Sequence, residues 1–332
     1  MFFGSVALAE AEGAILAHSA PLTGGTAKKG TVIDAALLAR LQQAGLDTVT
    51  VARLEPGDVD EDSAAARLAA ALVPDPAQAH LVVGQAFTGR VNLNAAGPGV
   101  AQVDAGAVAA LNAIDPSITL ATLPPLTRVG PRTLVGTVKI ISYGVDEARL
   151  QAACDAARAA VCVQPVVLRS AGLVLTEVPG QKSSLSEKGA AAMEGRLRAL
   201  GMELAGVETV PHETDALAAA LRRLPGEIAL ILTGSATSDL HDVGPQAVRV
   251  AGGSVNRFGM PVDPGNLLFV GSLDARPVVG LPGCARSPAL NGADWVLERL
   301  ACGIAVGDAE IAAMGVGGLL KEIPLRPQPR EP

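Results

Sequence analysis

The sequence predicts an α/β protein: a three-layer α/β/α domain with a mostly parallel sheet, preceded by a smaller α+β, strand-rich region. Three observations support this prediction. From Pro165 onward, strand-like and helix-like patterns alternate regularly, as in sheets whose strands are joined by helices. The run Ile228–Leu232 is entirely apolar, which is typical of a strand buried on both faces of a parallel sheet. Residues 73–163 instead hold short β-branched runs separated by Gly, Pro and Asn.

The first elements follow a β-α-β order. A short apolar strand is expected over Gly13–Ala17, and another strand over Thr48–Leu54. Between them, Asp34 is placed to cap a helix whose leucines recur at helical spacing. A second, alanine-rich helix is expected over Glu61–Leu72, because acidic residues gather near its first turn, where the helix dipole favours them.

The strand-rich module of residues 73–163 is expected to contain two clear strands and two helices. The strands lie over Ile118–Leu123 and Leu134–Ile141, and the helices near Asp104–Ile114 and Asp146–Ala160. The break Val163-Gln164-Pro165 then predicts a domain boundary. We therefore expect an N-terminal α+β region over residues 1–163, an α/β domain over 164–305 and a C-terminal tail or linker over 306–332.

The α/β domain is expected to alternate strands and helices to its end. Its strands are predicted over 166–176, 203–210, 228–232, 267–270 and 278–281. Its helices are predicted over 184–200, 215–224 and 245–250, with a closing helix that runs through Trp295 to Leu300. Ligands in such sheets bind beyond the carboxyl ends of the strands, so the loops at these ends are the first place to look for a site.

Composition limits the function classes. The chain has 332 residues, 49% of them hydrophobic, so it can bury a substantial core. It carries 26 Lys and Arg against 33 Asp and Glu, a net charge of -7, and 2% aromatic residues, which argues against nucleic-acid binding. The N-terminal stretch lacks a basic segment, and no apolar run reaches membrane-spanning length. We expect a cytoplasmic protein with no membrane partner.

The cysteines and histidines do not form a metal-binding pattern. Four cysteines, Cys154, Cys162, Cys284 and Cys302, show no CxxC spacing, and the four histidines are scattered. No structural metal is predicted, and a reducing compartment is expected. His212 precedes a predicted helix and is interpreted as a surface residue.

The segment Leu281–Pro288 predicts an anion site. A glycine turn at Gly283 opens onto the expected start of the closing helix, where backbone N–H groups lack intrahelical partners. Arg286 and Ser287 could add a guanidinium and a hydroxyl. Alternatively, this is an ordinary strand-to-helix turn in which Ser287 caps the helix. Cys284 at such a helix start could be a reactive thiolate, although it has no evident His or Asp partner and a structural role is the alternative.

The loop Thr233–Pro245 is the second candidate segment. It leaves the apolar strand Ile228–Leu232 and gathers hydroxyls with the carboxylates of Asp239 and Asp242. Because both loops follow strands of one sheet, they are expected to face the same crevice. Alternatively, Asp242 serves only as the cap of the next helix.

Both segments resemble the molybdopterin-binding domain family of MogA-type adenylyltransferases and MoeA-type molybdotransferases. Thr233-Gly234 matches the TG that opens the loop signature, Asp242 matches its aspartate, and Pro245 matches the MogA-type proline. Gly280-Leu281-Pro282-Gly283 resembles the MoeA-type GLPG, and Asp263-Pro264-Gly265-Asn266 falls where that type has KPGKP. The resemblance is strongest to the divergent molybdopterin-binding domain that occurs fused to nucleotidyl- or glycosyl-transferase-like domains.

The resemblance implies that the chain binds molybdopterin and takes part in molybdenum cofactor biosynthesis or handling, with molybdate insertion by a molybdotransferase as the candidate reaction. Asp242 would be the catalytic residue, and Mg²⁺ and molybdate would be further cofactors. The residues implied to bind the cofactor are Thr233, Gly234, Ser235, Ser238, Asp239, Pro264, Gly265, Gly280, Pro282, Gly283, Cys284, Arg286 and Ser287. A nucleotidyltransferase or molybdoenzyme partner and a homo-oligomer are also expected.

Two other functions stay open. Both lysines of KPGKP are replaced, by Asp263 and Asn266, which removes positive charge that would hold molybdate or nucleotide phosphates. This loss favours a non-catalytic carrier that presents the cofactor to a transferase partner. An unrelated α/β enzyme acting on phosphosugars or nucleotides could use the same glycine turn.

Overall fold

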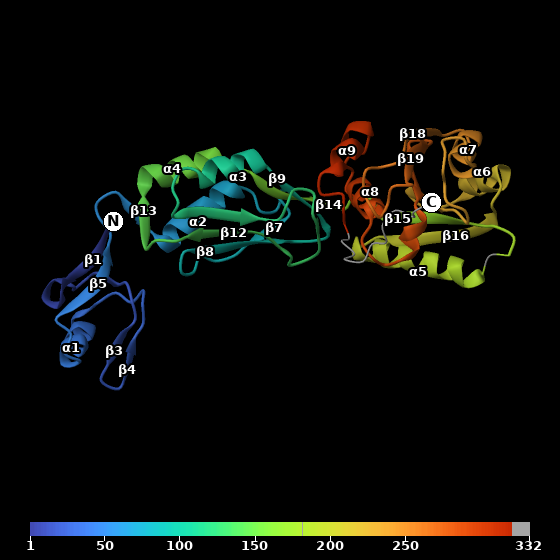
Figure 1. Cartoon of the computed structure of the whole chain (residues 1–332). Helices are drawn as coiled ribbons and strands as arrows, with labels where there is room; N and C mark the ends of the chain where they lie inside the picture. The colour runs from blue at the N-terminus through green and yellow to red at the C-terminus, as the bar shows by residue number, and fades with distance from the viewer. Residues whose placement is uncertain (181, 321–332) are drawn as a thin grey trace, which may run out of the picture. The chain divides into compact units, whose positions relative to one another are not determined.

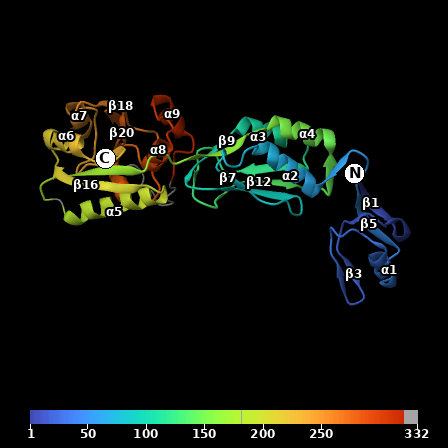
Figure 2. The ribbon, with the colours of Figure 1, turned by 180° about the vertical axis from the view of Figure 1, so that it is seen from behind.

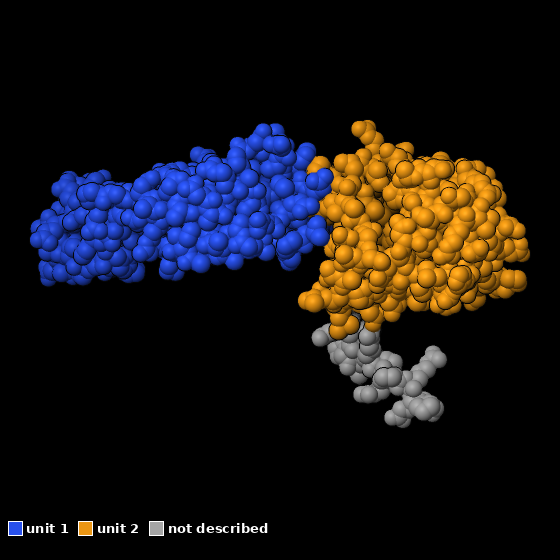
Figure 3. Space-filling model, turned by 90° about the horizontal axis from the view of Figure 1, so that it is seen from above, with its two compact units in different colours: residues 1–97, 101–164 blue, residues 98–100, 165–332 orange. Residues whose placement is uncertain are grey.

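The structure is a computed structural model that describes residues 1–180 and 182–320, and it divides into two compact units (Figures 1 and 3). The first unit holds residues 1–97 and 101–164, and the second holds residues 98–100 and 165–332. Each unit has hydrophobic clusters of its own, so each is described by itself. The predicted tail over 306–332 lies partly outside the described residues; its described part contains the short helix α9, Asp308–Ala312.

The first unit begins with a small antiparallel sheet. Its strand order is β1 (Phe2–Ala7), β5 (Thr48–Arg53) and β2 (Ile15–Leu16), and a separate hairpin joins β3 (Ala20–Leu22) to β4 (Gly25–Ala27). Helix α1, Ala35–Gln43, is capped as predicted, because the Asp34 carboxylate accepts the Leu37 N–H at 2.7 Å. The strand, helix and strand predicted here are all present, but β2 pairs with β5 in antiparallel fashion, so they do not form a parallel β-α-β unit.

The rest of the first unit is also built on antiparallel strands. A four-stranded sheet has the order β10 (Ile118–Thr122), β12 (Leu134–Ile140), β8 (Arg90–Ala95) and β7 (Leu81–Val83). A two-stranded sheet pairs β6 (Asp58–Asp60) with β13 (Gly144–Asp146). A three-stranded sheet has the order β11 (Arg128–Val129), β9 (Gly99–Val103) and β14 (Val161–Pro165). The helices are α2 (Glu61–Leu72), α3 (Ala105–Asn112) and α4 (Glu147–Ala156). Asp60, Asp104 and Asp146 cap these three helices.

The second unit contains a mixed six-stranded sheet. Its order is β16 (Glu203–Pro211), β15 (Ser170–Glu177), β17 (Ile228–Leu232), β20 (Arg276–Leu281), β19 (Phe269–Leu273) and β18 (Ser254–Phe258). The first four strands are parallel, whereas β19 and β18 are antiparallel to their neighbours. The prediction of a mostly parallel sheet therefore holds only for this four-strand part. Only Asp274 and Ala275 join β19 to β20, and so short a connection forces the two strands to run antiparallel. Both residues have positive φ, 50° and 64°, and a two-residue turn reverses the chain.

Helices cover both faces of this sheet. Alternate residues of β17 enter two different cores: Leu230 packs with α5 (Ser183–Ala199) and α8 (Gly292–Ala301), and Ile231 packs with α6 (Thr214–Arg223) and α7 (Val243–Val250). Figures 1 and 2 show α5 on one side of β15 and β16, and α6 with α7 on the other. The apolar run of β17 is explained by this burial on both faces.

The closing helix begins later than predicted. Residues Gly283–Arg286 form a 3₁₀ turn, and α8 begins at Gly292 with Asn291 as its cap and Asp294 completing a capping box. Ser287 is extended, with ψ 144°, because the following Pro288 disfavours the helical conformation there. The predicted anion site at a helix start over Gly283–Ser287 is therefore wrong in that respect. No helix in the described part of the chain is long and apolar enough to span a membrane.

Candidate functional site

Four loops meet at one edge of the six-stranded sheet. Because β16, β15, β17 and β20 are parallel, their carboxyl ends lie at the same edge, which we call the carboxyl edge. The residues at these ends or directly after them are Thr176–Glu177, His212, Thr233–Asp242 and Pro282–Ser287. The two loops that the sequence singled out are thus placed side by side, as expected from the strand order.

Arg286 connects these two loops. Its Nη2 donates to the Thr233 carbonyl at 2.6 Å, and its Nε is buried without a hydrogen-bond partner among the described residues. No carboxylate within the described ranges lies in ion-pair distance of Arg286, and burial lowers the pKa of its guanidinium. A Cβ at Gly283 would lie 3.6 Å from Nη1 of Arg286, so this glycine leaves space beside the cation. An unpaired, partly buried guanidinium of this kind is suited to an anion.

The carboxylate of Asp242 is engaged by its own loop. One oxygen accepts the Val243 N–H at 2.7 Å, and the other accepts the Ser238 N–H at 3.0 Å and lies 3.4 Å from the Ser238 hydroxyl. Burial acts to raise the pKa of Asp242, but these amides and the positive charge of His212 outweigh it and lower the pKa below its ordinary value. Asp242 therefore caps α7, as the alternative interpretation expected, and is an anion at neutral pH.

The rest of the Thr233–Asp242 loop is held by local hydrogen bonds. The Thr233 hydroxyl donates to the Ser235 carbonyl at 2.6 Å, and Asp239 accepts the His241 N–H at 2.7 Å. The side chains of Ser235 and Ser238 are exposed. Both hydroxyls therefore lie at the surface of the carboxyl edge, where a ligand could reach them.

Thr176 and His212 belong to this edge, although the sequence analysis did not select them. The buried Thr176 hydroxyl accepts the Gly234 N–H at 2.8 Å and lies 2.8 Å from Nδ1 of His212. His212 is half-buried, so it remains accessible at the surface while its ring contacts the Thr176 hydroxyl. Both residues stand at the end of a strand or directly after one, which is the positional signal that selected Thr233 and Gly283.

No sequence signal marked Arg196, whose side chain holds the backbone of the Gly283–Ala289 segment. Its Nε donates to Asp294 at 2.5 Å, and its Nη atoms donate to the carbonyls of Ala285, Ser287 and Ala289 at 2.9, 2.8 and 3.1 Å. The side chain is 9% exposed. A single arginine on α5 thus fixes the backbone that carries Arg286.

Several predicted ligand-binding residues have structural surroundings instead. Gly280 is buried inside β20, where a Cβ would lie 1.9 Å from the Phe269 ring. Pro264 and Gly265 pack on the start of α8: the Pro264 carbonyl accepts the Gly292 N–H at 2.8 Å, and a Cβ on Gly265 would lie 2.5 Å from that nitrogen. Packing alone therefore explains why glycine or proline occupies these three positions.

The remaining residues of the glycine turn contribute less than the sequence suggested. The carbonyl of the buried Pro282 accepts the Ala285 N–H at 2.9 Å, and the Ser287 hydroxyl accepts the Ala289 N–H at 3.2 Å instead of capping α8. Cys284 is exposed as a residue, but desolvation of its sulfur by neighbouring atoms raises the pKa of the thiol. A raised pKa disfavours the thiolate form, which favours the alternative of a structural role for Cys284.

Metal-binding groups are not assembled at this edge. Within residues 1–180 and 182–320, no three His, Cys, Asp or Glu side chains are arranged to hold a metal ion. The predicted Mg²⁺ and molybdate thus have no protein ligand set among the described residues.

Comparison with known proteins gives one family match and distant structural likenesses. A family model described as a domain of unknown function (DUF8806) matches residues 5–53, which do not include the carboxyl edge. No curated protein matches the chain. The molybdopterin biosynthesis MoeA protein from Pyrococcus horikosii is 13% identical, covering 91% of this chain and 76% of that one with a TM-score of 0.31. The molybdopterin biosynthesis enzyme MoaB from Thermus theromophilus is 19% identical, covering 41% of this chain and 98% of that one with a TM-score of 0.28.

Proposed function

We propose that the second unit binds molybdopterin at its carboxyl edge and takes part in molybdenum cofactor biosynthesis or handling. The observation that carries this proposal is the state of Arg286. It bridges the two loops that resemble the molybdopterin-binding family, has no carboxylate partner among the described residues and keeps a buried Nε unpartnered. A guanidinium without a carboxylate partner at this edge is suited to hold an anionic group such as a phosphate.

The residues of the edge divide between the two ends of such a ligand. Molybdopterin carries a terminal phosphate and a dithiolate that ligates molybdenum. Arg286 would hold the phosphate, with Gly283 leaving room for it, and the exposed hydroxyls of Ser235 and Ser238 would contact the pterin side. Asp242 would keep the loop in place through its contacts to Ser238 and Val243.

A carrier without catalytic activity is the second candidate, and the geometry of Asp242 favours it. Both carboxylate oxygens already accept backbone N–H groups of their own loop. The positions of the two KPGKP lysines are occupied by Asp263 and Asn266, so the positive charge that would hold molybdate is reduced. A protein with this edge binds and presents the cofactor, and a separate transferase partner acts on it.

Binding is tested by titrating the full chain with molybdopterin. Arg286→Gln is expected to weaken binding roughly 10- to 100-fold, because it removes a charge-assisted hydrogen bond to phosphate. Arg276→Gln is the matched control: burial lowers the pKa of Arg276 too, and it donates to the carbonyls of Leu224 and Leu221 at the opposite end of β20. Equal affinities of the two variants would show that Arg286 does not hold the ligand, and no binding by the wild type would end the proposal.

Adding molybdate, with and without Mg²⁺ and ATP, separates the enzyme from the carrier. Asparagine can still cap α7 but has no carboxylate. If both Asp242→Ala and Asp242→Asn abolish metal insertion, catalysis by the carboxylate is established. Binding with no insertion under any of these conditions supports the carrier.

A further inference from the structure

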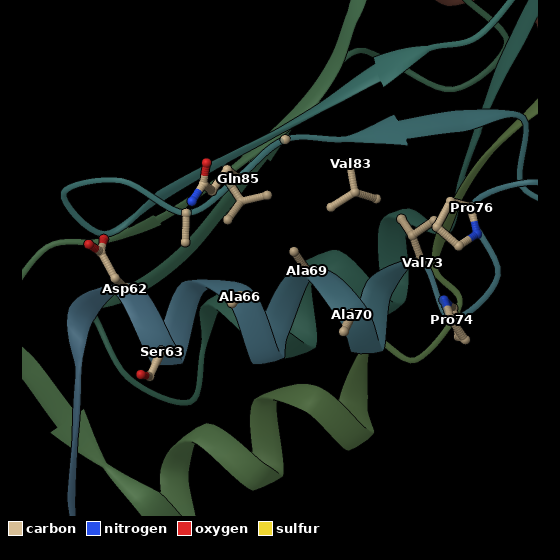
Figure 4. Close-up of a pocket in the computed structure, with 13 residues that line it drawn as sticks. Asp62, Ser63, Ala66, Ala69, Ala70, Val73, Pro74, Pro76, Val83 and Gln85 are labelled. Atoms are coloured by element: carbon tan, nitrogen blue, oxygen red, sulfur yellow. The ribbon is translucent and has the colours of Figure 1, made fainter.

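A groove in the first unit lies between helix α2 and the segment that follows β7. Its volume is about 600 Å³, which is within the usual range of binding sites. Figure 4 shows Ala66, Ala69 and Ala70 on α2, with Val83 and Gln85 across the groove from them. Small apolar side chains make up most of the lining. None of the lining residues belongs to the carboxyl edge, so the function proposed above leaves this groove unexplained.

The groove is open because α2 covers only part of its sheet. Leu68 and Leu72 of α2 are buried in the core, and the helix packs against β8 and β12. Ala66 and Ala70, one helical turn apart, are exposed and line the groove instead. Because alanine has a short side chain, the helix leaves an accessible channel next to Val83.

The strand on the other side of the groove is the outer strand of the sheet. The outward N–H of Leu81 donates to the Pro76 carbonyl at 3.0 Å, so the available outward groups lie further along, from Val83 onward. The Gly84 N–H donates to the Asn92 carbonyl at 2.8 Å, and the Ala96 N–H donates to the His80 carbonyl at 3.0 Å. The even-numbered residues therefore face β8, and strand alternation turns the N–H and C=O of Val83 and Gln85 away from it. Apart from the β7–β8 ladder, no hydrogen bond to these two backbones is present in the part of the chain that the structure describes.

The opposite edge of the same sheet is closed. At β10, the Asn112 side chain donates to the Leu120 carbonyl at 2.9 Å and accepts the Leu120 N–H at 2.8 Å. This side chain occupies the outward pair that another strand would use. The middle of β10 is thus occupied by a side chain, whereas no such side chain occupies the outward groups of Val83 in the described residues.

One end of the groove is acidic. Asp62 is the one charged residue in the lining, and one of its oxygens accepts the Gly89 N–H at 2.6 Å. Asp60 and Glu61 lie next to it at the start of α2. A segment that bears a basic side chain at this end would complement the charge.

We propose that this groove binds an extended peptide segment of a partner protein, which adds as a strand to β7 and carries a basic residue next to Asp62. The four outward backbone groups of Val83 and Gln85 would pair with the peptide, and its alternate apolar side chains would lie against Ala66 and Ala70. From Asp62 to Val73 the helix is about 17 Å long, which matches about five residues of extended chain.

The test is a selection of random short peptides displayed against the purified full chain. Enriched peptides are expected to alternate apolar residues and to carry a Lys or Arg. The double variant Ala66→Gln and Ala70→Gln should weaken their binding about tenfold or more, because the longer side chains occupy the groove. Ala109→Gln, at an exposed alanine of α3 outside the groove, is the matched control and should change nothing.

Two further readouts locate the peptide. Asp62→Asn should weaken the binding of peptides that carry a basic residue. It should not change the binding of the same peptides after that residue is replaced by Gln. Hydrogen exchange of the Val83 and Gln85 amides should slow when a peptide is bound. Failure to enrich any peptide, or equal binding by the double variant and the control, would overturn the proposal.

Discussion

At the scale of single residues, the arginines decide how the carboxyl edge is built. Arg286 joins the Thr233 and Gly283 loops, whereas Arg196 is turned inward onto three loop carbonyls and Asp294. The sequence could not distinguish these roles, because both residues are arginines in segments predicted as helix or helix start. The partners of Arg196 lie about ninety residues further along the chain, and only the tertiary fold brings them to α5.

Replacing Arg196 is expected to destabilise the second unit strongly. Arg196→Ala would leave the carboxylate of Asp294 buried without its partner, so we expect the free energy of unfolding to fall by about 3–5 kcal/mol. Arg198→Ala removes a neighbouring arginine whose side chain is 76% exposed and pairs with Glu194 one turn away, and it should cost at most about 0.5 kcal/mol. Urea denaturation of both variants measures the difference. Similar midpoints would mean that the Arg196 clamp does not stabilise the unit.

At the scale of elements, the features that depend on local pattern were predictable from the sequence, and those that depend on strand pairing were not. The apolar run of β17 identified a strand buried on both faces, and Asp34 identified the cap of α1. The start of α8 was placed too early because Gly283 and Ser287 resemble a cap, whereas Asn291 with Asp294 is the actual one. The direction of β19 was not readable from apolar content, since the two-residue turn at Asp274–Ala275 sets it.

The pair β19–β20 also explains a glycine that the family resemblance assigned to the ligand. Gly280 lies directly opposite Phe269, and a Cβ there would meet the ring at 1.9 Å. Gly280→Ala is therefore expected to destabilise the second unit by about 1–3 kcal/mol through overpacking, and Phe269→Leu in the same chain should recover part of this loss. Gly195→Ala, at a helical position of α5 with open space, is the control and should stabilise slightly. Thermal unfolding measures the stability of each variant. If the double variant is no more stable than Gly280→Ala, the packing explanation is contradicted.

At the scale of the whole molecule, the site depends on the topology more than on any motif. The convergence of the Thr233 and Gly283 loops was predictable, because parallel strands bring their carboxyl ends to one edge. Thr176 and His212 obey the same rule, yet a lone threonine and a lone histidine carry no local pattern that marks them. The β7 groove was not predictable at all, since it depends on how much of the sheet α2 covers.

The division into two units with separate cores predicts that each unit can lose stability by itself. Leu150 is fully buried in the core of the first unit, and Leu297 is almost fully buried in a core of the second. Each Leu→Ala change should cost about 2–5 kcal/mol, because it removes buried methyl groups and leaves a cavity. Hydrogen exchange of the full chain should then increase in the first unit for Leu150→Ala and in the second for Leu297→Ala. Since Arg286 and its loop lie in the second unit, Leu150→Ala should leave molybdopterin affinity unchanged, while Leu297→Ala should weaken it as the unfolded fraction grows. Equal changes in both units for either variant would mean that they unfold as one cooperative body, and the carboxyl edge would then depend on the core of the first unit as well.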